Sequence, residues 1–253
     1  MRDSLIRSTL PEQGPYAGSS PGGPAVLVRF AVVAPAPTMV AAVVFDCDGL
    51  LVETESRWTI AETAVFAAHG FPFGPAEKAM LLGRAVEEAA PELAEYFGRP
   101  GEADAIAAEL LDLVHREVAA KADALPGAFE LLQACAARVP VAVASNSPRS
   151  LVDLALERSG LGELLPVRVT LDDVGRPKPA PDIFLEACRR LGADPASSVA
   201  FEDSGTGTRS ARAAGLYVVG VPSFVGVELD CDWVVDTLAD PRLVAWAATL
   251  RPA

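Results

Sequence analysis

The 253-residue chain has few histidines, few cysteines and few positive charges for its length. Its two histidines, His69 and His115, lie far apart in the sequence and form no ligand cluster, so we expect both at helix surfaces or helix caps. The four cysteines show no C-x-x-C spacing. This scatter argues against a zinc site or a disulfide framework and favours a reducing, cytoplasmic environment.

Acidic residues outnumber basic ones by 34 to 21, which gives a net charge of −13. Nucleic acids require a basic face that neutralises phosphates, and anionic membrane surfaces attract basic segments, so we expect neither partner. No uninterrupted apolar run reaches the ~18 residues of a membrane span. A small anionic ligand is compatible with this charge, since a metal ion or a few local cations hold such a ligand against the overall field.

Residues 1–38 differ in composition from the rest of the chain. The stretch "PEQGPYAGSSPGGPA" is rich in Pro, Gly and Ser and offers little apolar surface to bury. The following "AVLVRFAVV" imitates the apolar region of a signal peptide, but Arg29 interrupts it and Pro35 ends it. We therefore expect a disordered N-terminal extension, with an added edge strand from "AVLVRFAVV" as the alternative.

From Val40 onward, short apolar runs alternate with long stretches rich in Ala, Leu and Glu. The short runs predict buried strands, and the long stretches predict helices. We expect strands within 40–46, 139–145, 167–171, 198–203 and 216–221, and a block of helices at 54–69, 75–82, 84–97 and 102–120. Such alternation is typical of an α/β protein with a doubly wound parallel sheet. The sequence predicts a core over 39–53 and 122–253, with an inserted helical domain over 54–121.

Polar residues follow several of the predicted strands at the point where each strand ends. In doubly wound sheets, ligands bind at the carboxyl ends of the strands, where side chains from different strands converge. The candidates are Asp46, Asp48, Ser145, Asn146, Glu202 and Asp203, together with Lys178 in a loop before a helix. One strand end of this kind is compatible with a turn or a helix cap, but the combination indicates a catalytic site.

The same residues stand in four segments that resemble the signature motifs of the haloacid dehalogenase superfamily. The segments are "DCDGLL" with Asp46 and Asp48, "VASNSPR" with Ser145, "RPKPAPDIF" with Lys178, and "FEDSGTGTRSARAAG" with Glu202 and Asp203. The helical insert resembles the cap of the β-phosphoglucomutase and phosphoglycolate phosphatase branch. The resemblance implies a Rossmann-like catalytic core with a helical cap, and a phosphohydrolase.

Four of these residues have the chemistry that phosphoryl transfer requires. Asp46 can attack phosphorus to form an aspartyl-phosphate, and Asp48 can protonate the leaving oxygen and later deprotonate water. Ser145 can hold phosphoryl oxygens, while Lys178 neutralises charge on the phosphoryl group and on Asp46. The presence of Asp48 favours phosphoryl transfer, because the dehalogenases of the superfamily release a halide that needs no proton and do without this residue.

A metal site is expected at the acidic residues. Asp46, Glu202 and Asp203 would repel one another when brought together, and a hard divalent cation such as Mg²⁺ relieves this repulsion. The family resemblance adds the backbone carbonyl of Asp48 as a ligand.

Three further residues are expected to contact the substrate. Gly49 and Asn146 stand next to the catalytic candidates in the sequence. Arg84, in "LLGRAVEEA" of the insert, is predicted to reach a second anionic group of the substrate. The alternative for Arg84 is an ion pair with Glu87 or Glu88 at helical spacing.

The reaction and the substrate are left with alternatives. β-Phosphoglucomutases carry a histidine where this chain has Trp58, which argues against a mutase. Glu53 stands where an aspartate is commoner in the family, so its role is open. We expect a magnesium-dependent phosphatase, monomeric or weakly dimeric, that acts on a small phosphorylated metabolite such as a sugar phosphate or a phosphoglycolate-like compound. The alternatives are a phosphosugar mutase and a non-catalytic protein that binds a phosphometabolite.

Overall fold

The computed structural model describes residues 36–224 and 226–253, so most of the predicted N-terminal extension lies outside the described residues. In the described part, six parallel strands form a sheet in the order β4-β3-β2-β5-β6-β7. They are β2 (Val43–Phe45), β3 (Val141–Ala144), β4 (Val167–Val169), β5 (Val199–Glu202), β6 (Tyr217–Gly220) and β7 (Trp233–Val234). The strand order reverses at β2, which pairs with β3 on one side and β5 on the other. The predicted doubly wound sheet is confirmed.

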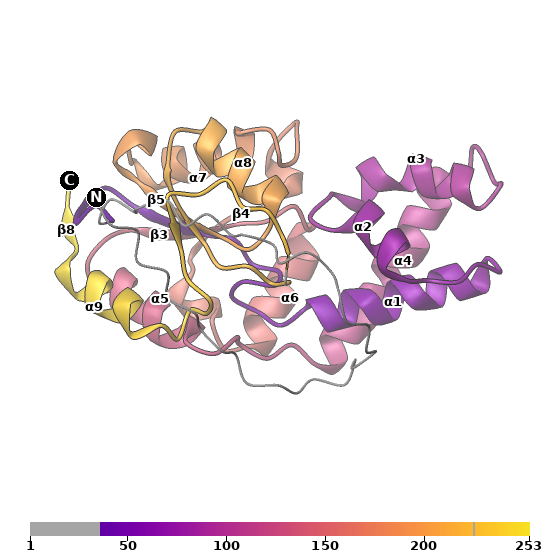
Figure 1. Ribbon diagram of the computed structural model, residues 1–253, viewed down its shortest axis with the longest axis horizontal. Coiled ribbons are helices and arrows are strands. Elements are labelled where there is room, and N and C mark those ends of the chain that lie inside the picture. Colours follow the sequence, from indigo (N-terminus) through magenta and orange to yellow (C-terminus); the bar gives the residue numbers. More distant parts are fainter. Residues whose placement is uncertain (1–35, 225) are drawn as a thin grey trace, which may run out of the picture. The chain divides into compact units, whose positions relative to one another are not determined.

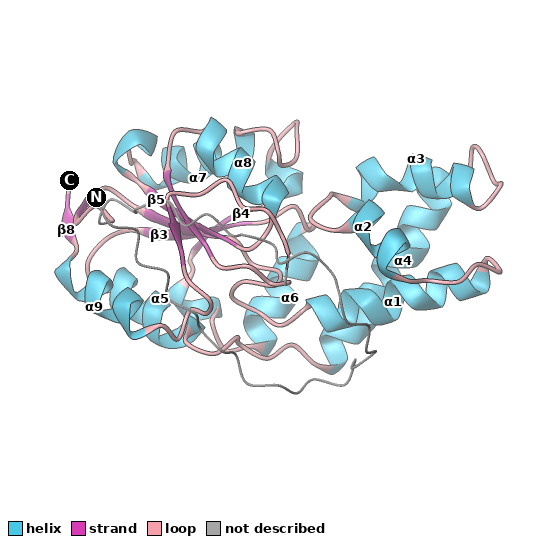
Figure 2. Ribbon diagram, viewed as in Figure 1, coloured by secondary structure: helices cyan, strands magenta, loops and turns pink. Residues whose placement is uncertain are grey.

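Helices cover both faces of this sheet (Figures 1 and 2). On one face lie α7 (Asp182–Leu191) and α8 (Gly205–Ala213); on the other lie α5 (Ala128–Ala136), α6 (Arg149–Arg158) and α9 (Pro241–Thr249). Side chains alternate along a strand, so Val43 and Phe45 pack on the α5 side while Val44 packs on the α7 side. Burial on both faces explains why these strands read as continuous apolar runs.

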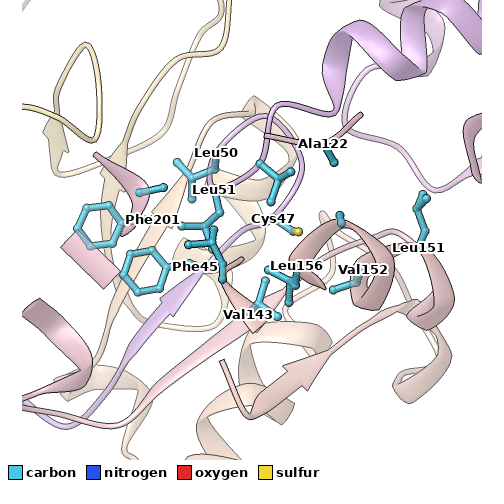
Figure 3. Close-up of a cluster of buried hydrophobic side chains, with 14 of the residues drawn as sticks. Phe45, Cys47, Leu50, Leu51, Ala122, Val143, Leu151, Val152, Leu156 and Phe201 are labelled. Carbon is cyan, nitrogen blue, oxygen red and sulfur yellow. The ribbon is translucent and has the colours of Figure 1, made fainter. Parts of the chain in front are cut away.

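The loop after β2 begins inside the hydrophobic core. Phe45 stacks on Phe201 of β5, with ring centroids 5.0 Å apart. Cys47 is fully buried and lies in the same cluster as Val152 and Leu156 of α6 (Figure 3). Because successive side chains alternate in direction, burying Cys47 turns the aspartates on either side of it away from this core.

The inserted block consists of four helices: α1 (Glu55–Ala68), α2 (Pro75–Leu81), α3 (Val86–Tyr96) and α4 (Ala103–Ala120). Each begins and ends within two residues of its predicted range. The ring centroid of Phe66 in α1 lies 4.9 Å from the ring centroid of Phe97 and 5.0 Å from the ring centroid of Phe73. His69 occupies the C-terminal cap of α1 and stacks on Phe97, so it has one of the two kinds of position predicted for it. We call this block the cap.

The sequence does not predict β7, α9 or the pairing of β1 (Met39–Val40) with β8 (Arg251–Pro252). The indole Nε1–H of Trp246 in α9 donates a hydrogen bond to the carbonyl oxygen of Pro37 (2.9 Å). The backbone N–H of Arg251 donates to the carbonyl oxygen of Thr38 (2.8 Å). Pro37 and Thr38, which the sequence assigns to the extension, are therefore held by the core. A disordered extension therefore stays a prediction, and only for residues before Pro37.

Short connections complete the described chain. Three of them are 3₁₀ helices, η1 (Gly162–Leu164), η2 (Leu171–Asp173) and η3 (Pro195–Ser197). Among the helices of residues 36–224 and 226–253, none combines the length and the apolar character that crossing a membrane requires.

Gly127 provides a test of how closely the core packs before α5. It has φ +84°, and a Cβ there would overlap the backbone of Ala239. A left-handed backbone costs a non-glycine residue about 1–2 kcal/mol, and overpacking adds about 1–3 kcal/mol. We expect Gly127→Ala to lower the free energy of unfolding in urea by roughly 2–5 kcal/mol. Gly160→Ala, at φ +75° in open space, should lose only the backbone part, and equal losses would contradict the overlap.

Candidate active site

Asp46, Lys178 and Glu202 form a buried ion-pair cluster at the carboxyl end of the sheet. β2 and β5 are neighbours, so Asp46, directly after β2, meets Glu202, the last residue of β5. The Lys178 ammonium joins them, with Nζ 2.6 Å from Asp46 Oδ1 and 2.5 Å from Glu202 Oε1. Nζ also donates to the carbonyl oxygen of Ala144, the last residue of β3 (2.8 Å). Lys178 therefore points inward, as the sequence predicts.

Asp203 adds a third buried carboxylate, and oxygens of Asp46, Glu202 and Asp203 lie within 4.8 Å of one another. Burial raises the pKa of Asp46 to about 8, helped by the charge of Glu202 and opposed by Lys178. Burial and the negative charges of Asp46 and Glu202 raise the pKa of Asp203 well above its usual value. Burial alone would lower the pKa of Lys178, but the two carboxylates that it bonds raise it. Three carboxyl groups and one ammonium thus meet here, so ionisation of all three carboxyl groups leaves negative charge for a bound cation to balance.

Three hydroxyl groups hold the side chain of Asp48. Thr54 Oγ1 donates to Oδ1 (2.8 Å), while Ser145 Oγ (3.0 Å) and Ser147 Oγ (2.8 Å) donate to Oδ2. A hydroxyl group both donates and accepts, so these partners suit the ionised and the protonated carboxyl group alike. The sequence predicts Ser145 as a phosphoryl ligand but not this contact, and it misses Thr54 and Ser147. Only the fold brings the start of the cap and the loop after β3 to one carboxylate.

Asn146 and Gly49 lie beside these groups. The side chain of Asn146 accepts from the backbone N–H of Lys178 (2.8 Å) and donates to the carbonyl oxygens of Lys178 (3.3 Å) and Gly83 (3.4 Å). It therefore links the Lys178 loop to the cap. Gly49 has φ +79°, and a Cβ there would stand 2.6 Å from Asp203 Oδ2, so this turn requires glycine. Contact of Asn146 or Gly49 with a substrate stays a prediction.

A cavity of about 70 Å³ lies between the strand ends and the cap. Six of the candidate residues line it from the core: Asp46, Asp48, Ser145, Asn146, Lys178 and Asp203. The cap lines it with residues of all four helices and with the loop at 82–84. The candidate residues therefore open onto one space, and the cap provides the opposite wall.

Arg84 lies at this cavity, but its guanidinium is bound within the cap. Nη1 donates to the carbonyl oxygen of Met80 and to Glu92 Oε2 (2.8 Å each), and Nη2 donates to the carbonyl oxygen of Glu88 (3.0 Å). The ion pair within the cap is thus formed, with Glu92 as the partner in place of the expected Glu87 or Glu88. Contact of Arg84 with a substrate anion stays a prediction.

The chain is similar in sequence to known hydrolases. The family model described as haloacid dehalogenase-like hydrolase matches residues 40–215, which include every candidate residue. A bifunctional riboflavin kinase/FMN phosphatase of Arabidopsis thaliana is 34% identical over 209 residues, which cover 81% of this chain and 55% of that protein, so the chain spans about half of its length. A validoxylamine A 7'-phosphate phosphatase of Streptomyces hygroscopicus subsp. limoneus is 34% identical over 179 residues, which cover 70% of this chain and 83% of that protein.

The structure is similar to solved ones as well. CbbY from Rhodobacter sphaeroides, in complex with phosphate, matches with a TM-score of 0.70 and 27% sequence identity. The match covers 80% of this chain and 96% of that one. The predicted Rossmann-like core is confirmed by this likeness.

Lys178 balances the buried carboxylates, so its removal should destabilise the metal-free protein. Taking one partner out of a buried ion-pair network costs about 3–5 kcal/mol. We expect Lys178→Met to lower the free energy of unfolding by that amount in urea and EDTA at pH 8. The loss should be smaller at pH 6, because Asp46, with a pKa of about 8 in the wild type, is already mostly protonated there and has less ion-pair energy to lose when Lys178 is removed.

The matched control is Lys121→Met, which removes a lysine whose side chain is 60% exposed. It should change the free energy of unfolding by less than about 0.5 kcal/mol. A loss for Lys178→Met no larger than this would contradict the balancing role of Lys178.

Proposed function

Because the chain belongs to the haloacid dehalogenase-like hydrolases and is a phosphoric monoester hydrolase, we propose that it is a magnesium-dependent phosphatase acting through an aspartyl-phosphate on Asp46. The observation that carries the proposal is that Asp46 and Asp48 line one cavity while Lys178 holds Asp46 in place. The two curated relatives are named for removing phosphate from FMN and from validoxylamine A 7'-phosphate. These names support a small phosphorylated metabolite as the substrate.

The first proposed step transfers the phosphoryl group to Asp46. A carboxylate oxygen of Asp46 attacks phosphorus, and the bond between phosphorus and the leaving oxygen breaks. Asp48 gives its proton to that oxygen, so the leaving group departs as a neutral alcohol. Lys178 Nζ, 2.6 Å from Asp46 Oδ1, favours the ionised nucleophile and balances charge on the phosphoryl group.

The second proposed step releases phosphate. Asp48, now ionised, accepts a proton from a water molecule, and the water oxygen attacks phosphorus. The bond between phosphorus and Asp46 breaks, which restores the carboxylate. Ser145 and Asn146 also line the cavity. We propose that they bind the phosphoryl oxygens in both steps.

The donor set of the site fits a hard divalent cation. Asp46, Glu202 and Asp203 present carboxylate oxygens, the ligands that Mg²⁺ prefers in proteins, and their summed charge exceeds that of Lys178. The family resemblance adds the backbone carbonyl oxygen of Asp48 to the proposed ligands. A bound magnesium ion would supply positive charge beside the phosphoryl oxygens.

The cavity supports a phosphatase over a phosphosugar mutase. Trp58 lines it at the position where the mutases of the family carry a histidine. Neither His69 nor His115 lines the cavity. His69 stacks on Phe97, and Nε2 of His115 is hydrogen-bonded to Ser150 Oγ (3.1 Å). In the proposed reaction, water and not a sugar hydroxyl therefore accepts the phosphoryl group from Asp46.

Asp46 and Asp48 should differ in how they affect the reaction. We expect the wild-type protein with Mg²⁺ to release phosphate from 4-nitrophenyl phosphate, and Asp46→Asn to release none, because the nucleophile is lost. Asp48→Asn should slow the first turnover of an alkyl phosphate by about 10²–10⁴-fold, the range of general acid–base catalysis. The first turnover of the aryl ester should slow far less, since 4-nitrophenolate departs without a proton. Rapid-mixing measurements of the first turnover separate this step from the later attack of water.

Each alternative has its own outcome in this experiment. Equal slowing of the alkyl and aryl esters would contradict the acid role of Asp48. Activity of Asp46→Asn close to that of the wild type would contradict the nucleophile. Isomerisation of a sugar phosphate without net release of phosphate would identify a mutase, and binding without turnover would identify a non-catalytic binding protein.

Asp203→Asn tests the metal site without measuring activity. The raised pKa of Asp203 means that its ionisation costs folding free energy, and this cost grows as the pH rises above about 4, the unfolded value. In EDTA at pH 8, we expect Asp203→Asn to raise the free energy of unfolding by at least about 1.4 kcal/mol, the equivalent of one pKa unit. Millimolar Mg²⁺ should stabilise the wild type but not this variant. Asp236→Asn, an exposed control, should change neither result, and a wild type that Mg²⁺ does not stabilise would contradict the site.

A further inference from the structure

Besides Arg84, three charged side chains of the cap line the cavity, and the proposed reaction steps do not use them. Lys78 of α2 lies between Glu55 and Glu62 of α1, with Nζ 3.2 Å from Glu55 Oε2 and 2.8 Å from Glu62 Oε2. The exposed fractions of these side chains are only 15% for Lys78, 21% for Glu55 and 4% for Glu62. We call these residues the cap triad.

The cap triad has more acceptors than its own lysine satisfies. With both carboxyl groups ionised, it carries one net negative charge. Burial raises the pKa of Glu55 and of Glu62, and Lys78 opposes both shifts. Glu55 Oε2 is buried and receives no hydrogen bond of good geometry from the described residues, although Lys78 Nζ lies 3.2 Å away. A hydroxyl or amino group of a ligand that donates to the carboxylates of Glu55 and Glu62 from the cavity would offset the cost of burying them.

The cations that line the cavity are already bonded to groups of the protein. Within residues 36–224 and 226–253 these cations are Lys78, Arg84 and Lys178. Lys78 pairs with the two glutamates of the cap triad. Arg84 donates to acceptors within the cap, and Lys178 pairs with Asp46 and Glu202. A leaving group with a carboxylate or a second phosphate would thus lie near the carboxylates of the triad. None of these three cations would be unpaired and able to bind its negative charge. Like charges placed together in this way disfavour binding.

Apolar side chains line the same cavity. Trp58, Leu81 and Val86 contribute to the wall formed by the cap. A wall that combines apolar surface with a few hydrogen-bond acceptors suits a ligand whose carbon skeleton is decorated with donors. Polyhydroxylated and amino-substituted alcohols have this character.

We infer that Glu55, Glu62 and Lys78 select the leaving group, and that the substrate is the phosphomonoester of a donor-rich alcohol without a second anionic group. Hydroxyl or ammonium hydrogens of the leaving group donate to Glu55 and Glu62, and Lys78 donates to one of its oxygens. This inference rests on the proposed phosphatase and narrows its substrate. It gives the selecting role to the cap triad in place of Arg84.

The wild-type protein with Mg²⁺ tests the inference without any substitution. We expect kcat/KM for sorbitol 6-phosphate and glucosamine 6-phosphate to exceed that for 2-phosphoglycolate and 3-phosphoglycerate by at least about ten-fold. 4-Nitrophenyl phosphate reports the phosphatase activity itself. If this ester is hydrolysed and the carboxylated esters match the donor-rich ones, the inference is overturned while the proposed function stands. If no ester is hydrolysed, the proposed function fails and the inference fails with it.

Glu62→Gln then assigns the selectivity to the triad, since it keeps the shape of the side chain and removes its charge. It should lower kcat/KM for the donor-rich esters by at least about ten-fold, mainly through KM, and should narrow their advantage over the carboxylated esters. Hydrolysis of 4-nitrophenyl phosphate, which has no donors for the triad, should stay within about two-fold. Equal losses on every ester would indicate a structural role and overturn the inference.

Two further variants complete the test. Glu109→Gln removes a glutamate of α4 that pairs with His69 and does not line the cavity, so the ratios between esters should stay as in the wild type. Glu55→Gln changes the more exposed glutamate of the triad and repeats the measurement if thermal unfolding shows that Glu62→Gln does not fold. Unchanged ratios in a folded variant of either triad glutamate would overturn the inference.

Discussion

Lys178 shares one ammonium between Asp46 and Glu202, at 2.6 and 2.5 Å, in a place where all three side chains are buried. Ions out of contact with water are costly unless they are paired and hydrogen-bonded, and here the pairing is incomplete because Asp203 adds another carboxyl group. Burial, together with this imbalance, raises the pKa of Asp46 and of Asp203. It also makes the site a receptor for positive charge, so the stability of the apoprotein and the binding of a cation are linked.

The sheet makes this concentration of charge possible. Adjacent parallel strands deliver Asp46 and Glu202 to the same edge, and helices on both faces exclude water from the strands that hold them. Small residues then allow the close approach of backbone and carboxylates: Gly49 leaves room for Asp203, and Gly207 at the start of α8 leaves room for Glu202. The core is therefore closely packed where the phosphoryl chemistry is proposed.

The cavity has a second charged group on its other wall, and this group is made differently. The cap triad comes from two helices of the insert and is rich in acceptors for its single lysine. Asn146 connects the two walls, since it bonds both the Lys178 loop and the carbonyl oxygen of Gly83. Phosphoryl transfer and recognition of the leaving group are thus assigned to different parts of the chain.

The sequence by itself determined the alternation of strands and cap helices, because apolar periodicity and helix-breaking residues are local signals. It also determined Asp46, Asp48, Lys178 and the acidic residues after β5 as candidates, since their types and order match the motifs of one family. Only the tertiary structure decided that Thr54 and Ser147 hold Asp48, that Arg84 is bound within the cap, and that Lys78 lies between two glutamates of another helix. These contacts join residues that are distant in the chain or face one another across a turn. No local pattern encodes such pairings, because they depend on how helices and strands pack.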